Sequence, residues 1–263
     1  MRAFFVSLHS EFYKSRKTLA FWASILLPVV ICVLMSYGFI SRAPKISNDP
    51  SLVLWLRYIG AILGVMGILL LPILVIYNTY AITNLEYKGD TWKTLFSLPL
   101  PKFSIYASKF IYIVFLTFLT LFLFVFLIYG SGMLISYIKP ELKFAEYNAL
   151  PFITIVFARL FFSTLGIIAI QFLMNLIWTD FLKPFGLGFI ALIMALITVS
   201  LNWEYTDFIP YAYPNIGVRE ITKIHPDKIS EVVLFDKYSL YSSLFALVIF
   251  IIGYFIVSKK AIK

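Results

Sequence analysis

Few residues in this sequence have the types and spacing that catalysis requires. The two histidines, His9 and His225, are far apart in the chain, and the one cysteine is Cys32. The sequence contains no HExxH pair for a metal, no GxSxG turn for a nucleophilic serine and no glycine-rich phosphate loop. We therefore expect no metal, no cofactor and no catalytic residue in this chain.

Three polar side chains within one apolar run are candidates for a binding role: Arg159, Gln171 and Asn175. Ionisable and polar groups in an apolar environment cost free energy and usually serve a purpose. Two interpretations are open. The three residues line a substrate path, or Arg159 extends towards the membrane boundary while Gln171 and Asn175, one helical turn apart, hydrogen-bond to a neighbouring helix.

The composition indicates that these residues lie in a membrane protein. Hydrophobic residues make up 61% of the chain and charged residues 13%, about half the share of charge in a soluble domain. Six apolar runs are long enough to cross a bilayer as helices, and they lack the period-two alternation of barrel strands. They are residues 18–40, 58–84, 104–129, 151–178, 184–201 and 238–257.

We therefore predict an all-α integral membrane protein with six transmembrane helices, forming a single domain over residues 1–263. Pro28 and Pro72 fall inside apolar runs, where membrane helices tolerate a kink. The first run is too long for a signal peptide, and we expect it to remain in the protein.

The distribution of Lys and Arg predicts the orientation. An even number of spans puts both termini on one side, and the surplus behind the net charge of +9 falls almost entirely on that side. Cytoplasmic loops carry such a surplus. We therefore predict a multi-pass protein of the cell membrane (inner or plasma membrane) with both termini cytoplasmic. Membrane lipids, rather than nucleic acid, are the expected partners of the basic residues.

Residues 1–17 have the pattern of an interfacial helix before the first span. Their apolar residues recur at helical spacing, at Phe4, Leu8 and Phe12, and the charged residues Glu11 and Lys14 fall largely on the other side. A frayed basic tail is the alternative.

Residues 202–237 form the longest segment on the side opposite the termini, and they contain Pro210, Pro214 and Pro226. Loops of this length are usually structured or functional. We expect one or two short external helices here, between the fifth and sixth spans.

The segment LEYKGDTWKTLFSLPLPKFSIYASKF, residues 85–110, places charge between two apolar runs. Gly89 permits a turn, and Asp90 or Thr91 can cap a short helix with Trp92 on its apolar face together with Leu95 and Phe96. The prolines that follow end this helix. We predict a short cytoplasmic helix within residues 85–103 that docks on a partner, the alternative being a charged loop without a partner.

This segment resembles the signature of ABC-2-type ABC transporter permeases. The matching residues are Glu86, Gly89, Leu95, Leu98, Pro99, Lys102 and Lys109. Trp92 and the stretch SEFYKSRKT near the N-terminus look closest to lantibiotic-immunity-type permease subunits. The family usually has an arginine soon after the proline turn, where this chain has Lys102. Other residues of the segment expected to contribute to coupling are Lys88, Asp90, Lys93 and Phe96.

The resemblance implies a permease subunit with the type V exporter fold, in which residues 85–103 couple it to an ATPase. Such permeases pair with a second permease chain, identical or different, and with two copies of a cytoplasmic ABC ATPase subunit. This chain has no Walker A motif, so ATP and Mg would be bound by that separate subunit. The implied cargo is hydrophobic or amphipathic, such as a peptide or a lipid-like molecule.

Two other functions remain open from the sequence. One is a channel or secondary transporter that works without an ATPase, although the spans contain no acidic residue to carry a coupled proton. The other is a membrane sensor subunit that transports nothing.

Overall fold

The computed structural model describes residues 2–88, 101–178 and 180–259, and these ranges contain helices and no strand. Six helical segments are long and apolar enough to cross a membrane. Their bounds are Leu19–Ser41, Ser51–Tyr87, Lys102–Ile138, Leu150–Ile177, Leu182–Ser200 and Lys237–Lys259. The predicted all-α fold with six spans is confirmed.

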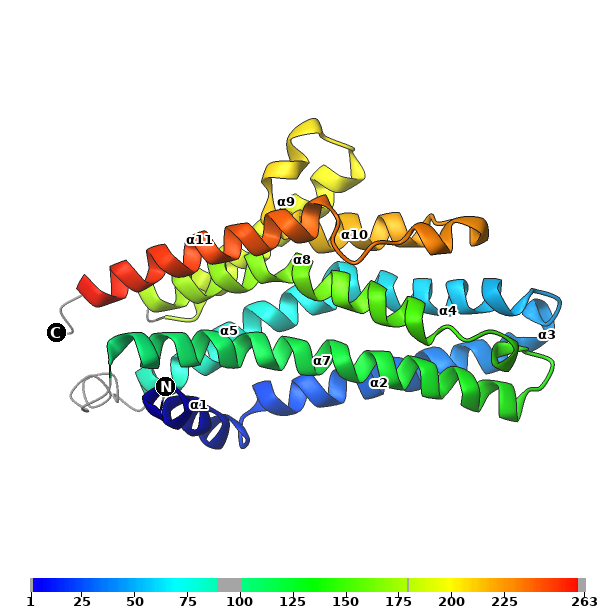
Figure 1. Cartoon of the computed structure of the whole chain (residues 1–263), viewed down its shortest axis with the longest axis horizontal. Helices are drawn as coiled ribbons and strands as arrows, with labels where there is room; N and C mark the ends of the chain where they lie inside the picture. Colours follow the sequence, from blue (N-terminus) through cyan, green and yellow to red (C-terminus); the bar gives the residue numbers. More distant parts are fainter. Residues whose placement is uncertain (1, 89–100, 179, 260–263) are drawn as a thin grey trace.

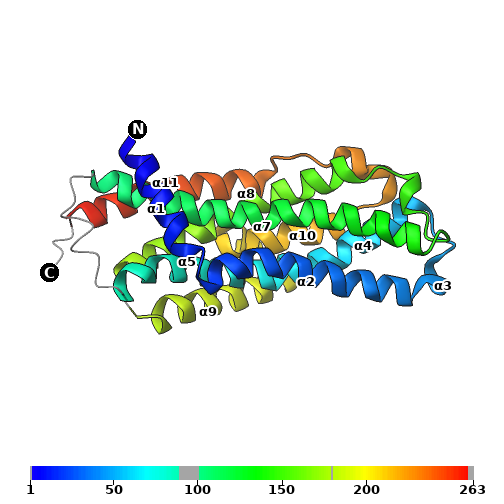
Figure 2. The ribbon, with the colours of Figure 1, turned by 90° about the horizontal axis from the view of Figure 1, so that it is seen from below.

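The helices run lengthwise along one elongated bundle, with both chain ends at the same end of it (Figure 1). In chain order the elements are α1 (Arg2–Ser15), α2 (Leu19–Ser41), α3 (Ala43–Ile46), α4 (Ser51–Val65), η1 (Met66–Leu70), α5 (Leu71–Lys88), α7 (Lys102–Ile138), η2 (Phe144–Glu146), α8 (Leu150–Ile177), α9 (Leu182–Ser200), η3 (Glu204–Phe208), η4 (Pro210–Ala212), α10 (Tyr213–Thr222), η5 (Pro226–Glu231) and α11 (Lys237–Lys259). Seen from below, α1 crosses the end of the bundle at a steep angle to the spans (Figure 2).

The second and third spans, Ser51–Tyr87 and Lys102–Ile138, are longer than the apolar runs that were predicted for them, residues 58–84 and 104–129. Both extend further at the end opposite the termini, because Trp55 of α4 fills the space between α7 and η2. Its indole nitrogen donates to the carbonyl of Phe144 at 2.9 Å, and a Cβ added to Gly132 of α7 would lie 2.2 Å from its ring. Gly132 lies inside α7, where the sequence predicted the helix to have ended. Its missing side chain leaves the room that the Trp55 ring occupies.

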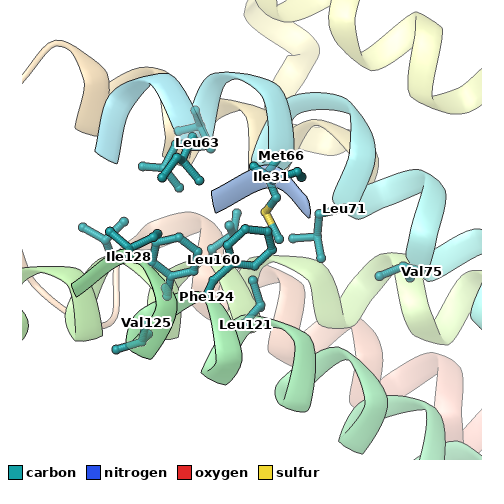
Figure 3. Close-up of a cluster of buried hydrophobic side chains, with 14 of the residues drawn as sticks. Ile31, Leu63, Met66, Leu71, Val75, Leu121, Phe124, Val125, Ile128 and Leu160 are labelled. Carbon is teal, nitrogen blue, oxygen red and sulfur yellow. The ribbon is translucent and has the colours of Figure 1, made fainter. Parts of the chain in front are cut away.

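The second span contains a π-helical turn, η1, just before Pro72. The Leu71 N–H donates to the carbonyl of Met66, five residues earlier. Pro72 has no N–H to donate to the α-helical hydrogen-bond pattern. This missing hydrogen bond explains why the helix changes locally to a π turn just before it. Met66 and Leu71 at the two ends of this turn point towards Phe124 of α7 in the centre of the core (Figure 3).

The segment between the fifth and sixth spans contains four short helices, η3, η4, α10 and η5, where one or two were predicted. Of these, α10 packs along the side of the bundle. It contacts α4, η1 and α8. Val218 of α10 sits directly over the π turn, because a Cβ added to Gly67 would lie 2.6 Å from Val218 Cγ2. The middle of the second span, at Gly67, is therefore a contact surface for α10.

Candidate coupling site at the end that carries the termini

Lys109 is a fully buried cation two turns into α7. Its side chain is 0% exposed, and its amine donates to Glu11 Oε2 at 2.8 Å and to Glu86 Oε1 at 2.9 Å. A buried ammonium group is stable only when opposite charges and hydrogen bonds compensate for the lost water. The two glutamates supply this compensation from two different helices, α1 and α5.

The partly exposed Lys14 of α1 completes the group. Its amine donates to Glu86 Oε1 at 2.9 Å and lies 3.7 Å from Glu11 Oε1. We call Glu11, Lys14, Glu86 and Lys109 the charge cluster. With two cations and two anions it is formally neutral, so it can stay ordered in a place with little water.

The cluster explains which face of α1 contacts the protein. Ser7, Glu11 and Ser15 recur every fourth residue and are the buried residues of α1. The Ser15 hydroxyl also bonds to the hydroxyl of buried Tyr112 on α7. The polar face of α1 thus packs on α7, whereas Phe12 is 41% exposed. Leu8 and Phe4 are partly exposed, so an apolar surface remains for the interfacial role predicted for this helix.

Two residues of the charge cluster, Glu86 and Lys109, flank residues 89–100 within and after the predicted coupling segment. Glu86 lies near the end of α5, whose last residue is Lys88, and Lys102 begins α7. The Tyr87 hydroxyl donates to the carbonyl of Leu176 at 3.2 Å, which joins α5 to the same end of α8. Eight predicted coupling residues lie outside the described residues: Gly89, Asp90, Trp92, Lys93, Leu95, Phe96, Leu98 and Pro99.

This arrangement suits a mechanical role rather than a chemical one. Glu86 precedes residues 89–100 in the chain and Lys109 follows them. The two side chains are bonded to each other, and Glu11 bonds α1 to the same amine. A displacement of residues 89–100 would act on α1, α5 and α7 together, because separating any of them breaks a buried ion pair.

The structure places Arg159 in a second charged group, near the opposite end of α8. Its guanidinium is 8% exposed and contacts Glu220 of α10 and, at 2.6 Å, Asp236 just before α11. Burial alone would raise the pKa of Asp236, but hydrogen bonds from Ser239 and the charge of Arg159 outweigh it and hold this pKa below its usual value. Arg159 thus links the segment between α9 and α11 to α8.

Gln171 and Asn175 are buried inside this chain. The Gln171 amide nitrogen donates to the Tyr211 hydroxyl at 2.7 Å, and the Asn175 amide nitrogen donates to the Gln171 carbonyl at 2.8 Å. Within the described part of the chain, the amide oxygens of both residues have no hydrogen-bond partner. A substrate-path role for them and for Arg159 stays a prediction.

One buried polar contact was not anticipated from the sequence. Asn78 of α5 donates to the Ser24 hydroxyl at 2.9 Å, and Thr120 of α7 donates to the Ser24 carbonyl at 3.0 Å. The sequence signal for this contact is that polar residues occur inside three of the apolar runs, since such residues usually hydrogen-bond across helices in a membrane.

Of the comparisons with known proteins, the one with family models gives a match. The profile described as ABC-2 family transporter protein matches residues 7–196, which is more than half of the chain. The matched range includes the charge cluster and the predicted coupling segment. The match is to the family as a whole, so the resemblance to lantibiotic-immunity-type subunits stays a prediction. No curated protein and no solved structure gives a significant match.

Proposed function

The chain belongs to the ABC-2 family of transporter proteins, and from this premise we propose that it is the permease subunit of an ATP-driven exporter. Its six membrane spans and its family make it a membrane component of a transporter. The proposal adds that a separate cytoplasmic ATPase drives it, and that its cargo is hydrophobic or amphipathic, such as a peptide or a lipid-like molecule.

The observation that carries the proposal is the bond of Lys109 to both Glu11 and Glu86. A force applied between the second and third spans would reach α1, α5 and α7 at once through this buried cation. Buried ion pairs seldom contribute much net stability. The buried pairs of Lys109 would therefore bring little benefit to a chain whose residues 89–100 contact no partner protein.

In this proposal two ATPase subunits bind ATP and Mg, and each contacts one permease chain through residues 85–103. The second permease is a copy of this chain or a different one. Both termini and the charge cluster lie on the cytoplasmic side of the cell membrane, as the excess of Lys and Arg at that side predicts. ATP-driven closure of the two ATPases would shift the spans towards an outward-open state.

Copurification tests the proposal. The tagged chain is coexpressed with each ABC ATPase subunit encoded in the same genome, extracted in mild detergent and assayed for bound ATPase and for ATP hydrolysis. We expect a stable complex whose hydrolysis rate falls at least tenfold when Trp92 and Leu95 are replaced by alanine. A folded chain that binds no ATPase would refute the proposal, and so would full coupled hydrolysis with both residues replaced.

The matched control is Lys183→Gln. Lys183 is the second residue of α9, at the start of the fifth span and on the same predicted side, and its side chain is 62% exposed beside Asp180. If any substitution at this side of the bundle slowed hydrolysis, this variant would be slow too, whereas a specific role of the docking segment predicts that Lys183→Gln hydrolyses ATP at the wild-type rate.

A further inference from the structure

A long apolar groove runs between α2 and α7 towards the end of the bundle opposite the termini. Its volume is about 500 Å³. Buried Cys32 and Ile135 are among the residues that line it, and its sides include Val33, Tyr37 and Leu134, which are 61%, 72% and 59% exposed. It is therefore open to the surroundings of the bundle along its length.

The groove has the length of one leaflet. Its lining extends from Val29 to Ile40 on α2 and from Phe126 to Ile138 on α7, which is about 17 Å at about 1.5 Å per residue. This is roughly half of the hydrocarbon core of about 30 Å. Because α2 crosses that core from Leu19 to Ser41, the groove occupies the half nearer Ser41.

The two serine hydroxyls of the groove wall are already bonded inside the protein. The Ser36 hydroxyl donates to the Cys32 carbonyl at 2.7 Å, and the Ser131 hydroxyl donates to the Ile128 carbonyl at 3.0 Å. Both also bond to the hydroxyl of Tyr58, at 2.8 Å and 2.7 Å. The wall therefore offers van der Waals contact to a hydrocarbon chain, and little to a ligand that needs polar partners.

Two basic residues follow the lining residues in the chain, at the end of the groove opposite the termini. Arg42 follows the last lining residue of α2 by two positions, and Lys139 directly follows that of α7. Lys139 lies 4.0 Å from Glu141 on an exposed surface, and within the described part of the chain no carboxylate lies within 4 Å of the exposed Arg42. An arginine in this state is suited to a phosphate group, which its planar guanidinium can bind through two hydrogen bonds.

We propose that this groove is a binding site for an anionic phospholipid, with one acyl chain between α2 and α7 and the headgroup phosphate at Arg42 and Lys139. The ligand belongs to the leaflet on the side away from the termini. Each buried methylene adds to the affinity, and the two basic residues add a preference for negative headgroups. The site does not depend on an ATPase or on transport.

A second copy of this chain is a poorer occupant. Around a twofold axis through the groove, the two copies would place Arg42 against the same two basic residues of the partner. Like charges in such a contact repel each other, whereas a phosphate neutralises them.

Gly130 allows a direct test, because it is a lining residue at which an added Cβ would meet no atom within 4 Å. Gly130→Leu should fill the groove without disturbing the helix packing, and leucine has a higher helix propensity than glycine. The full-length chain is purified from nanodiscs with equal amounts of phosphatidylglycerol and phosphatidylcholine, and retained lipid is counted by native mass spectrometry. We expect one phosphatidylglycerol per wild-type chain and at least a tenfold loss in Gly130→Leu.

The controls separate the headgroup, the groove and the fold. Arg42→Gln with Lys139→Gln should keep a lipid but lose most of the preference for phosphatidylglycerol. Gly186→Leu adds the same side chain in open space on α9 and should retain lipid like the wild type, with equal melting temperatures for all variants. Equal retention in Gly130→Leu would overturn the proposal. So would a lipid-free wild type whose Leu134→Cys variant forms disulfide-linked dimers, since a second copy would then occupy the groove.

Discussion

Glu11 and Lys109 are 98 residues apart in the sequence, yet their side chains meet at 2.8 Å in a fully buried ion pair. This contact fixes α1, the helix before the first span, to the start of the third span. The same amine bonds to Glu86 at 2.9 Å. The helix that lies across the end of the bundle is thereby joined to both helices that flank residues 89–100.

Replacing Lys109 by methionine should destabilise the chain strongly. The variant keeps an unbranched side chain of similar length but removes the fully buried one of the two cations that contact Glu11 and Glu86, which costs about 3–5 kcal/mol. We expect the melting temperature of the detergent-solubilised protein to fall by on the order of 10 °C, measured by tryptophan fluorescence.

Lys14→Gln is the matched comparison, because Lys14 contacts the same two glutamates but is 34% exposed. Its loss should change stability by less than about 1 kcal/mol, as is usual for a partly solvated pair. Equal effects of the two substitutions would show that Lys109 is not the buried centre of the cluster.

The close contact between α10 and the π turn predicts that Gly67→Ala destabilises the protein. An alanine there would place its methyl group about 2.6 Å from Val218 Cγ2, and such overpacking costs about 1–3 kcal/mol. Combining Gly67→Ala with Val218→Ala should destabilise less than the sum of the two single variants. Thermal unfolding of the four proteins of this cycle measures the difference.

Gly64 gives the control, since an added Cβ there meets no atom within 4 Å. Gly64→Ala should be neutral or stabilising by up to about 1 kcal/mol, because alanine is the better helix former. If Gly67→Ala and Gly64→Ala change the melting temperature equally, α10 does not pack closely against the second span at Gly67.

The sequence predicted the spans because their hydrophobicity is a local property. Lipid requires about 20 apolar residues in a row, so all six segments could be found without knowing their neighbours. The extension of the second span back to Ser51 could not be found in this way. It depends on Trp55 packing against Phe144 and Gly132, which lie more than 75 residues further along the chain.

The candidate site was predicted only in part for the same reason. Glu86 and Lys109 were selected from the segment that resembles the family, and Glu11 from the interfacial helix, but nothing local shows that they meet. Glu220 and Asp236 were not predicted as partners of Arg159, which lies 61 and 77 residues before them. Their pairing depends on the fold of the whole segment between α9 and α11.

Arg159→Gln should release α10 from α8. The substitution removes the cation that Glu220 and Asp236 share, so hydrogen exchange over residues 213–222 should become at least tenfold faster while exchange in α7 stays unchanged. Arg57→Gln is the control, because Arg57 forms an exposed pair with Asp49, and exposed pairs contribute little. Unchanged exchange in α10 of the Arg159 variant would contradict the assignment.

Acid should weaken the same contact. The folded-state pKa of Asp236 lies below its usual value, so its contribution to stability is complete above about pH 4 and is lost as the pH falls through the lowered pKa. An Asp236→Asn variant lacks this titration. We expect the difference in melting temperature between wild type and variant to be constant from pH 7 to pH 5 and to shrink below pH 4. A difference that persists to pH 2 would contradict the lowered pKa.

Site-specific cross-linking gives the most direct test of the proposed coupling role. A photoreactive amino acid is placed at Lys93 within the predicted coupling segment, or at Lys183 as the control on the same predicted side, and membranes that contain the coexpressed ATPase are irradiated. If residues 85–103 dock on the ATPase, we expect an efficient cross-link to it from position 93 and at least tenfold less from position 183. No cross-link from position 93 in a chain that folds and inserts normally would contradict this docking.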